Sequence, residues 1–510
     1  MALDSAFLDS VRKSFTAGPA LTLGAPVRGG ECHPEALVTL PLAMLNRHGL
    51  IAGATGTGKT KSLQLIAEQL SNAGTPVFLA DVKGDIAGIA VAGESNDRVA
   101  QRARDTGWVW KGAPFPVEFL SLSGARGAQL RATVSSFGPL LLSKVLDLNE
   151  TQTSVLTLVF KYSDDKQLPL LDFADLRAVL QHLSGEGSAE LQNLGGMSKA
   201  TVGVLLREMV ELEQQGAEAF FGEPEFDLTD LMQVERDGTG LVSVLELSDV
   251  QDKPALTSTF MLWMLARLYH ELPEVGDLDK PKLVFFFDEA HLLFRGASKA
   301  FLDQVQQIVR LIRSKGVGVF FITQNPRDVP EDVLGQLGHR VQHALRAFTP
   351  DDDKALKSAA RTFPKTDYYD VEETLTTLGT GEALVTVLGA NGVPTAPVAT
   401  RMIPPASRMG PLTDAEMAQR LGASRQVQEY AKAVDRESAR EIIGQRLAAA
   451  GGETAGAEAT PTPSRRVAKP TPSPFEQILR SPMARSVATT VTRGLLGALL
   501  GPTPRRRRGW

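Results

Sequence analysis

The chain has 510 residues, too many for a single hydrophobic core, so we expect roughly two to four structural units. Hydrophobic residues make up 43% of the chain and aromatic residues 6%, which is typical of an α/β or helix-rich protein, and the net charge of −5 excludes a globally basic nucleic-acid-binding surface. Cys32 is the single cysteine, so no internal disulfide can form, and a reducing, cytoplasmic location is expected.

Neither the N-terminus nor the most apolar helix candidate predicts membrane targeting. Residues 1–15 contain acidic residues and no uninterrupted apolar stretch, unlike a secretory signal. The segment TFMLWMLARLYHEL (259–272) is short and carries Arg267 and His270, whereas a membrane span needs about 20 apolar residues. We therefore expect a buried helix there and no integral membrane span.

From residue 49 the chain alternates buried strands with amphipathic helices. GLIAG (49–53) reads as a strand, a helix follows from about Lys59 to Gly74, and PVFLADVKGD (76–85) is a second strand. This βαβ unit implies a parallel sheet with a right-handed crossover. A further strand is expected in FPVEFLSL (115–122).

The middle of the chain has a mostly helical pattern. Helical spacing follows Asn149 and Asp172, which are plausible N-caps, and continues in residues 198–216. One strand candidate, LVSVLEL (241–247), interrupts these helices.

The sheet pattern then resumes. KLVFFFDEAH (282–291) and VGVFFITQ (317–324) read as buried strands on either side of an amphipathic helix. Three further segments follow in the sequence. They are HRVQHALRAF (339–348), a predicted helix that begins at Thr349-Pro350 and has Asp352 three residues on, and a predicted hairpin around Asn391-Gly392.

The predicted fold class is α/β, with a mainly parallel sheet, a mostly helical insertion and a flexible C-terminal tail. The expected organisation is a short N-terminal segment (1–45), a first core half with the P-loop (46–123), the helical insertion (124–280), a second core half (281–404), C-terminal helices that open at a Thr413/Glu416 capping box (405–450), a disordered linker (451–474) and a helical segment with an arginine-rich end (475–510).

Residues 53–60, GATGTGKT, match the P-loop pattern G-x-x-x-x-G-K-[ST] in full. The glycines let backbone N–H groups approach phosphate oxygens, Lys59 supplies a charge for the β- and γ-phosphates, and Thr60 supplies a hydroxyl for Mg²⁺. The motif lies between a buried strand and an amphipathic helix, which favours a phosphate site over a chance turn. We expect a nucleoside triphosphate to be bound by Gly53, Ala54, Thr55, Gly56, Thr57, Gly58, Lys59, Thr60 and Lys61.

The strand that ends at Asp288 supplies the second half of such a site. Asp288 is expected to hold Mg²⁺ through water, and Glu289 to orient and polarise the attacking water. A strand end with two acids is often only solvated, but its pairing with a complete P-loop favours the functional interpretation. An acid directly after the metal-binding Asp is typical of ATPases with an added strand between the two motifs. Gln324 ends the next strand, where it either senses the γ-phosphate or makes local bonds.

The letters Asp288-Glu289-Ala290-His291 also name the DEAH-box helicases, and the spacing excludes that class. In those helicases the motif lies much closer to the P-loop, whereas 229 residues separate Lys59 from Asp288. The residues after this motif also leave no room for a second motor domain.

The chain resembles the HerA/FtsK superfamily of ring-forming P-loop ATPases, and in particular the bacterial HerA-like proteins of the YjgR type. The segments that carry the resemblance are LNRHGLIAGATGTGKT (45–60), FLADVKGD (78–85), LNETQ (148–152), FFFDEAHLLF (285–294), IRSKGVGVFFITQNP (312–326), GHRVQHALRAFTP (338–350) and GEALVTVLG (381–389).

This resemblance implies a RecA-like core, ATP with Mg²⁺, and a homo-oligomer, often a hexameric ring that moves double-stranded DNA. Matched by position, Lys59 and Thr60 bind phosphate and Mg²⁺, Asp288 assists the metal, Glu289 is the catalytic base and Gln324 couples hydrolysis to movement. Arg313 matches the position of an arginine finger that acts on a neighbouring subunit; the alternatives are Arg310, Arg340 and Arg346. About 45 residues precede the P-loop, too few for the N-terminal barrel of HerA.

Two functions therefore stand side by side. One is a DNA translocase or helicase-like motor ATPase, and the other is an ATP-driven switch or assembly scaffold that acts on protein partners without nucleic acid. Asp81, Lys83 and Asp85 either orient Glu289 and contact the γ-phosphate or belong to a solvated loop.

The C-terminal segment and one residue pair near the N-terminus give weaker signals. The C-terminal segment is a candidate for docking on a protein partner. Its end, residues 505–508, either contacts DNA or membrane phosphates or is only a charged tail. Cys32 and His33 are adjacent, but two candidate ligands without others nearby are more often incidental than a metal site.

Overall fold

The computed structural model describes residues 2–15, 18–194, 196–276, 278–294, 297, 299–389, 391–434 and 436–455. Residues 1–447 form one compact unit and residues 448–510 a second. Within the second unit only residues 448–455, which end a helix, are described. The predicted C-terminal helical segment with its arginine-rich end lies outside the described residues, as does most of the predicted linker.

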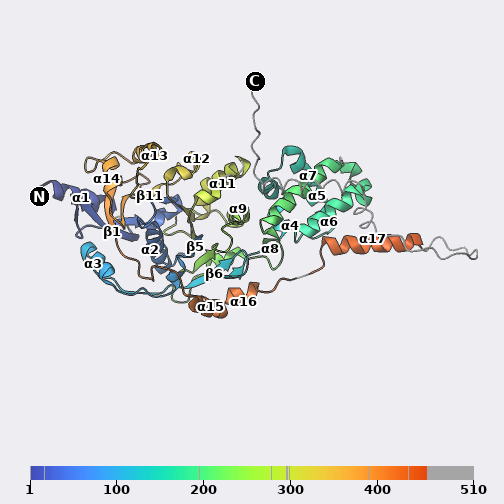
Figure 1. Ribbon diagram of the computed structural model, residues 1–510, viewed down its shortest axis with the longest axis horizontal. Coiled ribbons are helices and arrows are strands. Elements are labelled where there is room, and N and C mark those ends of the chain that lie inside the picture. Colours follow the sequence, from blue (N-terminus) through green and yellow to red (C-terminus); the bar gives the residue numbers. More distant parts are fainter. Residues whose placement is uncertain are drawn as a thin grey trace, which may run out of the picture. The chain divides into compact units, whose positions relative to one another are not determined.

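One mixed sheet forms the centre of the first unit (Figure 1). Its strands are β1 (Ala20–Arg28), β2 (Glu31–Cys32), β3 (Val38–Pro41), β4 (Gly49–Ala52), β5 (Val77–Asp81), β6 (Val117–Ser121), β7 (Ala128–Gln129), β8 (Val242–Glu246), β9 (Leu283–Phe287), β10 (Val317–Thr323), β11 (His339–His343), β12 (Glu382–Thr386) and β13 (Val398–Met402). They lie in the order β2-β1-β13-β12-β11-β4-β10-β9-β5-β8-β6-β7, with β3 paired to β1.

The half of the sheet from β11 to β7 is parallel throughout, and the half from β12 to β2 is antiparallel. β10 lies between β4, which precedes the P-loop, and β9, which ends just before Asp288. This is the added strand that the Asp-Glu pair predicted. The fold is therefore the predicted RecA-like P-loop class with a mainly parallel core.

Helices cover both faces of this sheet. They are α1 (Ala2–Phe15), α2 (Lys59–Asn72), α3 (Asp97–Thr106), α4 (Val134–Val145), α5 (Glu150–Asp165), α6 (Phe173–Ser184), α7 (Lys199–Gln214), α8 (Ala217–Phe220), α9 (Pro254–Glu271), α10 (His291–Phe294), α11 (Lys299–Ile312), α12 (Glu331–Leu334), α13 (Pro350–Ala360), α14 (Val371–Thr377), α15 (Asp414–Ala423), α16 (Arg425–Tyr430) and α17 (Ala439–Ala455).

The side chains of β9 show how the two faces divide. Leu283, Phe285 and Phe287 point into a core shared with α9, α11 and the helices α4 to α7. Val284 and Phe286 point into the opposite core, which contains the apolar face of α2. Because successive side chains of a strand point to opposite faces, a strand buried on both faces reads as an unbroken apolar run. The run before Asp288 is such a strand.

The local signals at helix ends are confirmed. Asn149, Asp172, Thr349 and Thr413 each cap a helix, and each forms a capping box with the residue three positions on. The hairpin is also confirmed, since β12 and β13 pair antiparallel and Leu388 bridges to Pro394.

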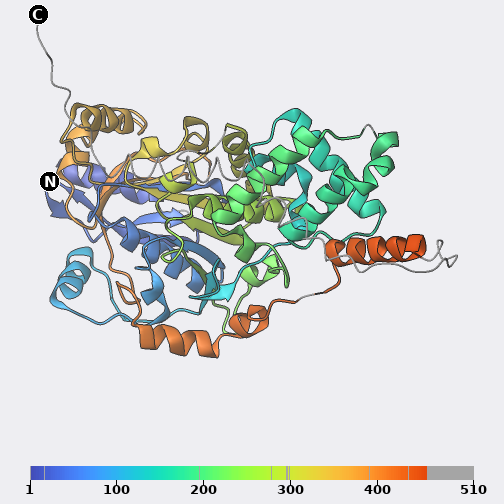
Figure 2. The same cartoon turned by 45° about the vertical axis from the view of Figure 1, so that its right-hand side comes forward.

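Two segments that the sequence analysis placed outside the core contribute strands to the sheet. β1 belongs to the predicted N-terminal segment, yet it pairs with β13 and buries Leu21 and Leu23. β8 falls within the predicted insertion, yet it lies between β5 and β6. The helices α4 to α7 form one group beside the sheet (Figures 1 and 2), and α4 and α8 contact α9. The division into domains stays a proposal.

Helix α9 is buried, as predicted for the most apolar segment, with Phe260, Leu262 and Trp263 at most 1% exposed. Over the described part of the chain, no helix has both the length and the apolar character needed to cross a membrane.

Candidate active site

The P-loop joins β4 to α2 through a turn that needs glycine at three positions. Gly53, Gly56 and Gly58 have φ values of 152°, 76° and 117°, a region that side chains disfavour. A Cβ on Gly53 would also lie 2.5 Å from the Cβ of His343. Because Gly58 has no side chain to cap α2, no side chain competes with an anion for the first amides of the helix.

Lys59 is the buried cation of this loop. Its Nζ donates to the carbonyl oxygens of Gly53 at 2.7 Å and Ala54 at 3.1 Å. Burial lowers the pKa of the Lys59 ammonium, and the nearby charge of Glu289 opposes that shift. Thr57 closes the turn by donating its hydroxyl to the Ala54 carbonyl at 2.7 Å. The loop is thus shaped by its own hydrogen bonds.

Sequence reasoning missed His343, which supports the P-loop from the neighbouring strand β11. Its Nδ1 donates to the Glu382 carbonyl at 2.8 Å, which leaves Nε2 to accept the Ser62 hydroxyl at 2.9 Å. Burial lowers the pKa of His343 to about 4, so the ring is neutral at pH 7. The P-loop is also tied to the start of β12, because the Gly381 amide donates to the Thr57 carbonyl at 2.8 Å.

Asp288 lies at the end of β9 and is only 6% exposed. One carboxylate oxygen accepts the Glu289 amide at 2.9 Å, and the other is buried with no hydrogen-bond partner among the described protein groups. Burial, together with the charge of Glu289, raises the pKa of Asp288 to about 7. A buried oxygen without a partner suits a cation, so Asp288 with the Thr60 hydroxyl fits Mg²⁺, whose remaining ligands are typically water and phosphate oxygens.

Glu289 is held on both carboxylate oxygens. Lys83 forms an ion pair with Oε1, while His291 Nδ1 lies 3.2 Å and Gln324 Nε2 3.5 Å from Oε2. Burial alone would raise the pKa of Glu289, but Lys83 outweighs it, with His291 and Gln324 acting in the same direction, and the pKa is lowered. The backbone of Glu289 has φ 47°, an uncommon conformation for a side chain of this size.

Gln324, one of the three groups around Glu289, also contacts the P-loop. The Thr55 hydroxyl donates to Gln324 Oε1 at 3.3 Å, so Gln324 bridges the P-loop and Glu289. The structure therefore brings Glu289, Gln324 and the P-loop together, as the motif spacing predicted.

The loop after β5 is built around Asp81. This carboxylate is fully buried and accepts the amides of Gly84 and Ile86, both at 2.8 Å. Of the two interpretations offered for this loop, solvation is wrong for Asp81. Its role is to fix the turn that carries Lys83 to Glu289.

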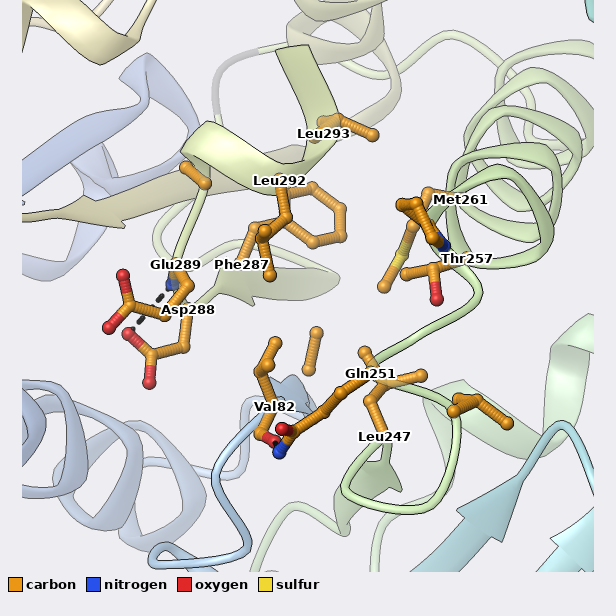
Figure 3. A pocket seen from close by; sticks show the side chains of 14 residues that line it. Val82, Leu247, Gln251, Thr257, Met261, Phe287, Asp288, Glu289, Leu292 and Leu293 are labelled. Carbon is orange, nitrogen blue, oxygen red and sulfur yellow. Dashed lines mark hydrogen bonds between the residues drawn. The ribbon is translucent and has the colours of Figure 1, made fainter. Parts of the chain in front are cut away.

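An apolar wall lies behind the two acids. A small cavity of about 40 Å³ is lined by side chains that include Val82, Leu247 and Met261. Figure 3 shows the carboxylates of Asp288 and Glu289 on one side and these apolar side chains on the other. Apolar surface beside an acid raises the free-energy cost of charging it.

Arg313 lies at the opposite edge of the sheet from the P-loop. It begins a short 3₁₀ turn just before β10, whereas the P-loop follows the far end of the parallel strand β4. The rise of about 3.3 Å per residue puts the two ends of β10 about 20 Å apart. The structure therefore does not bring Arg313 to Glu289 of its own chain.

Three of the four arginine candidates gather at this amino edge. Arg310, Arg313 and Arg340, together with Arg47, line a cavity of about 570 Å³, and none of the described residues lining it is acidic. Burial lowers the pKa of Arg340. The fourth candidate, Arg346, instead lines a cavity of about 590 Å³ beside Thr55 and Gln324.

The family model described as "Helicase HerA-like C-terminal" matches residues 28–508. The chain is 29% identical over 154 residues to a protein from Methanocaldococcus jannaschii described as a probable helicase, covering 28% of either chain. It is 27% identical over 150 residues to the "DNA double-strand break repair helicase HerA" of Sulfurisphaera tokodaii, covering 29% of either chain. The chain thus spans less than a third of the length of these curated relatives.

Among solved structures, the bacterial conjugative coupling protein TrwB is similar at 16% identity with a TM-score of 0.49, over 78% of this chain and 97% of that one. The same coupling protein has been solved in complex with ADP and Mg²⁺, with a TM-score of 0.47.

Proposed function

The chain belongs to the Helicase HerA-like C-terminal family, and from that premise we propose that it binds ATP with Mg²⁺ and hydrolyses it as a ring-forming motor on double-stranded DNA. One observation carries the hydrolytic part of this proposal. A complete P-loop, a buried acid with an unpartnered oxygen, and a second acid bridged to the P-loop by Gln324 form one cluster.

The proposed reaction uses each group in this cluster. The P-loop amides and Lys59 bind the phosphates, and Thr60 with Asp288 would hold Mg²⁺, which neutralises phosphate charge when bound. Glu289 takes a proton from water as the water oxygen attacks the γ-phosphorus, and ADP leaves with the electron pair of the broken bond. The contact from Thr55 through Gln324 to Glu289 gives hydrolysis a route to loop movement.

We propose that the amino edge contributes to an active site shared between two neighbouring copies. Since Arg313 precedes β10 and the P-loop lies beyond the other end of that strand, about 20 Å further on, we propose that it stabilises transition-state charge in a neighbouring copy. A head-to-tail interface between the carboxyl edge of one copy and the amino edge of the next produces a ring when the rotation closes. We propose Arg313 as the finger, with Arg310 and Arg340 in the same cavity as its alternatives.

The DNA part of the proposal is supported by the relatives. Both curated relatives are described as helicases, one of them as acting in DNA double-strand break repair. The net charge of −5 means that contact with DNA must come from a local basic surface. An ATP-driven switch acting on protein partners is the second candidate.

The deciding experiment compares the rate of ATP hydrolysis with and without duplex DNA. The motor predicts a faster rate with DNA and binding that weakens steeply with salt. If DNA does not change the rate of ATP hydrolysis and no salt-sensitive DNA binding is found, the motor proposal is wrong and the switch takes its place. Native mass measurement with ATP checks the ring, and a monomer under those conditions would contradict the shared site.

A further inference from the structure

The arginine-lined cavity at the amino edge of the sheet has the size of a ligand site. Its volume of about 570 Å³ lies within the roughly 300–1,000 Å³ that is typical of sites for small molecules. Its lining includes Arg47, Arg310, Arg313 and Arg340, and the described lining contains no acid. Positive charges gathered around one cavity repel one another, and an anion in the cavity relieves that repulsion. The cavity therefore favours a ligand with several negative charges.

Arg340 is a half-buried cation in the interior of the sheet. It lies in β11, which pairs with β4 on one side and with β12 on the other. Burial lowers the pKa of Arg340, and no neighbouring charge contributes to that shift. Within the part of the chain that the structure describes, its guanidinium forms no ion pair with an acid. A cation that loses water and gains no anionic partner is costly to the fold, and a bound anion would offset that cost.

The other three arginines come from three different elements. Arg47 ends a 3₁₀ turn (Leu42–Arg47) before β4, Arg310 lies in the last turn of α11, and Arg313 begins the turn before β10. β4 lies between β10 and β11 and runs parallel to both, so the amino ends of the three strands are side by side. Guanidinium groups suit phosphate in particular, because each presents N–H donors in a planar fork that matches two phosphate oxygens. The converging arginines therefore point to phosphate as the anion.

Apolar side chains also line this cavity. They belong to Leu337, Phe363, Pro364, Leu388 and Pro394, of which Leu337 is 3% and Phe363 9% exposed. A ligand that carries an apolar or ring-shaped part can bury it against these side chains, whereas inorganic phosphate cannot. The lining thus combines a cationic and an apolar part, which suits a ligand with the same two parts.

We propose that the amino-edge cavity binds, from solution, a small molecule with several phosphates and an apolar or ring-shaped part, which is the chemistry of a nucleoside polyphosphate. Arg47, Arg310 and Arg340 bind the phosphates, and Leu337 and Phe363 pack on the rest. This site is separate from the P-loop, which follows the other end of β4. Under the proposed function, the nucleotide of a neighbouring copy offers the same phosphate chemistry, so the test must separate the two sources.

The test removes the P-loop as a binding site. In Lys59→Ala the loop loses its cation, so neither the chain nor a neighbouring copy holds a nucleotide there. Calorimetry on the full chain of this variant should still show one site per chain for a non-hydrolysable ATP analogue. Inorganic tripolyphosphate should bind to the same site about tenfold more weakly, because it has no apolar part to bury.

Two changes are then added to Lys59→Ala, one at a time. Arg310→Met and Arg340→Met should each weaken binding of the analogue about tenfold, because each removes one cation from the phosphates. Arg310 is exposed, so its replacement is tolerated even where that of the half-buried Arg340 is not, and melting temperature reports whether each protein is folded. Arg425→Met is the matched control, because the Arg425 side chain is 84% exposed and does not line the cavity.

Three results would overturn this assignment. They are a Lys59→Ala chain that binds no analogue, binding that neither folded arginine variant weakens, and equal affinities for the analogue and tripolyphosphate. The proposed function fails in a different way. A wild-type chain that hydrolyses no ATP, while Lys59→Ala still binds the analogue, would contradict the ATPase proposal alone.

Discussion

The two edges of the parallel sheet differ in the side chains that they gather. At the carboxyl edge, Lys59, Gln324 and Glu289 are bonded to one another or to the loop. At the amino edge, four arginines line a cavity in which none of the described lining residues is acidic. Under the proposed function, one edge holds and hydrolyses a triphosphate, and the other supplies an arginine to the neighbouring copy. In the proposed ring, each copy would carry half of two sites.

Loss of the finger at the amino edge should have the largest effect. Arg313→Ala is expected to lower kcat about 10³-fold, because transition-state charge on the neighbouring nucleotide loses its cation. Affinity for ATP should stay near wild type, since the P-loop is intact. Phosphate release and nucleotide titration measure the two quantities. The control is Arg425→Ala, because the Arg425 side chain is 84% exposed. Unchanged turnover in Arg313→Ala would show that Arg313 is not the arginine finger.

Loss of the catalytic base at the carboxyl edge should have the second-largest effect on turnover. Glu289→Gln keeps the size of the side chain but cannot accept the proton of water, so turnover should fall about 10²-fold or more while ATP still binds. The same two assays apply, with Glu218→Gln, a change of an exposed residue on α8, as the control. Turnover at the wild-type rate would show that Glu289 is not the base.

A smaller effect is expected at Lys83, which positions Glu289. Lys83→Met should lower kcat about tenfold with little change in KM, because the carboxylate loses the ion pair that fixes it. Lys83→Arg should restore most of the rate, since it restores the charge. A variant whose KM rises while kcat holds would mean that Lys83 acts on phosphate binding instead.

The smallest effect concerns stability at mildly acidic pH. Burial lowers the pKa of His343 from 6.5 to about 4. Below pH 6.5 His343 is protonated in the unfolded chain, whereas in the folded chain it stays neutral down to about pH 4. The free energy of unfolding therefore decreases as the pH falls through this window. At pH 5.5 the loss is of the order of 1 kcal/mol for this residue. Urea unfolding at pH 7.5 and 5.5 should show a smaller pH dependence in His343→Gln, and an unchanged one would contradict the buried neutral ring.

The two edges also differ in how far the sequence predicts them. Gly53 to Thr60 and the caps at Asn149 and Thr413 are local patterns, because the residues that act together are neighbours in the chain. Asp288 is marked locally too, since it directly follows an unbroken apolar strand. No local sequence pattern indicates that Arg47 and Arg340 lie close together. These two residues share a cavity only because β4 and β11 are neighbours in the sheet.

Two further features depend on strand pairing in the same way. His343 supports Ser62 across 281 residues. β1 had a detectable signal in the alternation of Leu21, Leu23 and Ala25, all of which are buried. Its partner β13 begins 370 residues after the end of β1, so its place in the sheet did not follow from sequence.

The most direct test of the shared site mixes two inactive variants. Arg313→Ala and Glu289→Gln chains with different affinity tags are co-expressed, and assemblies carrying both tags are purified. A site is then intact wherever an Arg313→Ala copy supplies Glu289 and its neighbour supplies Arg313. Random mixing with independent sites predicts recovery of about a quarter of the wild-type ATPase rate. Activity no greater than that of the two variants alone would contradict a site built from the two edges.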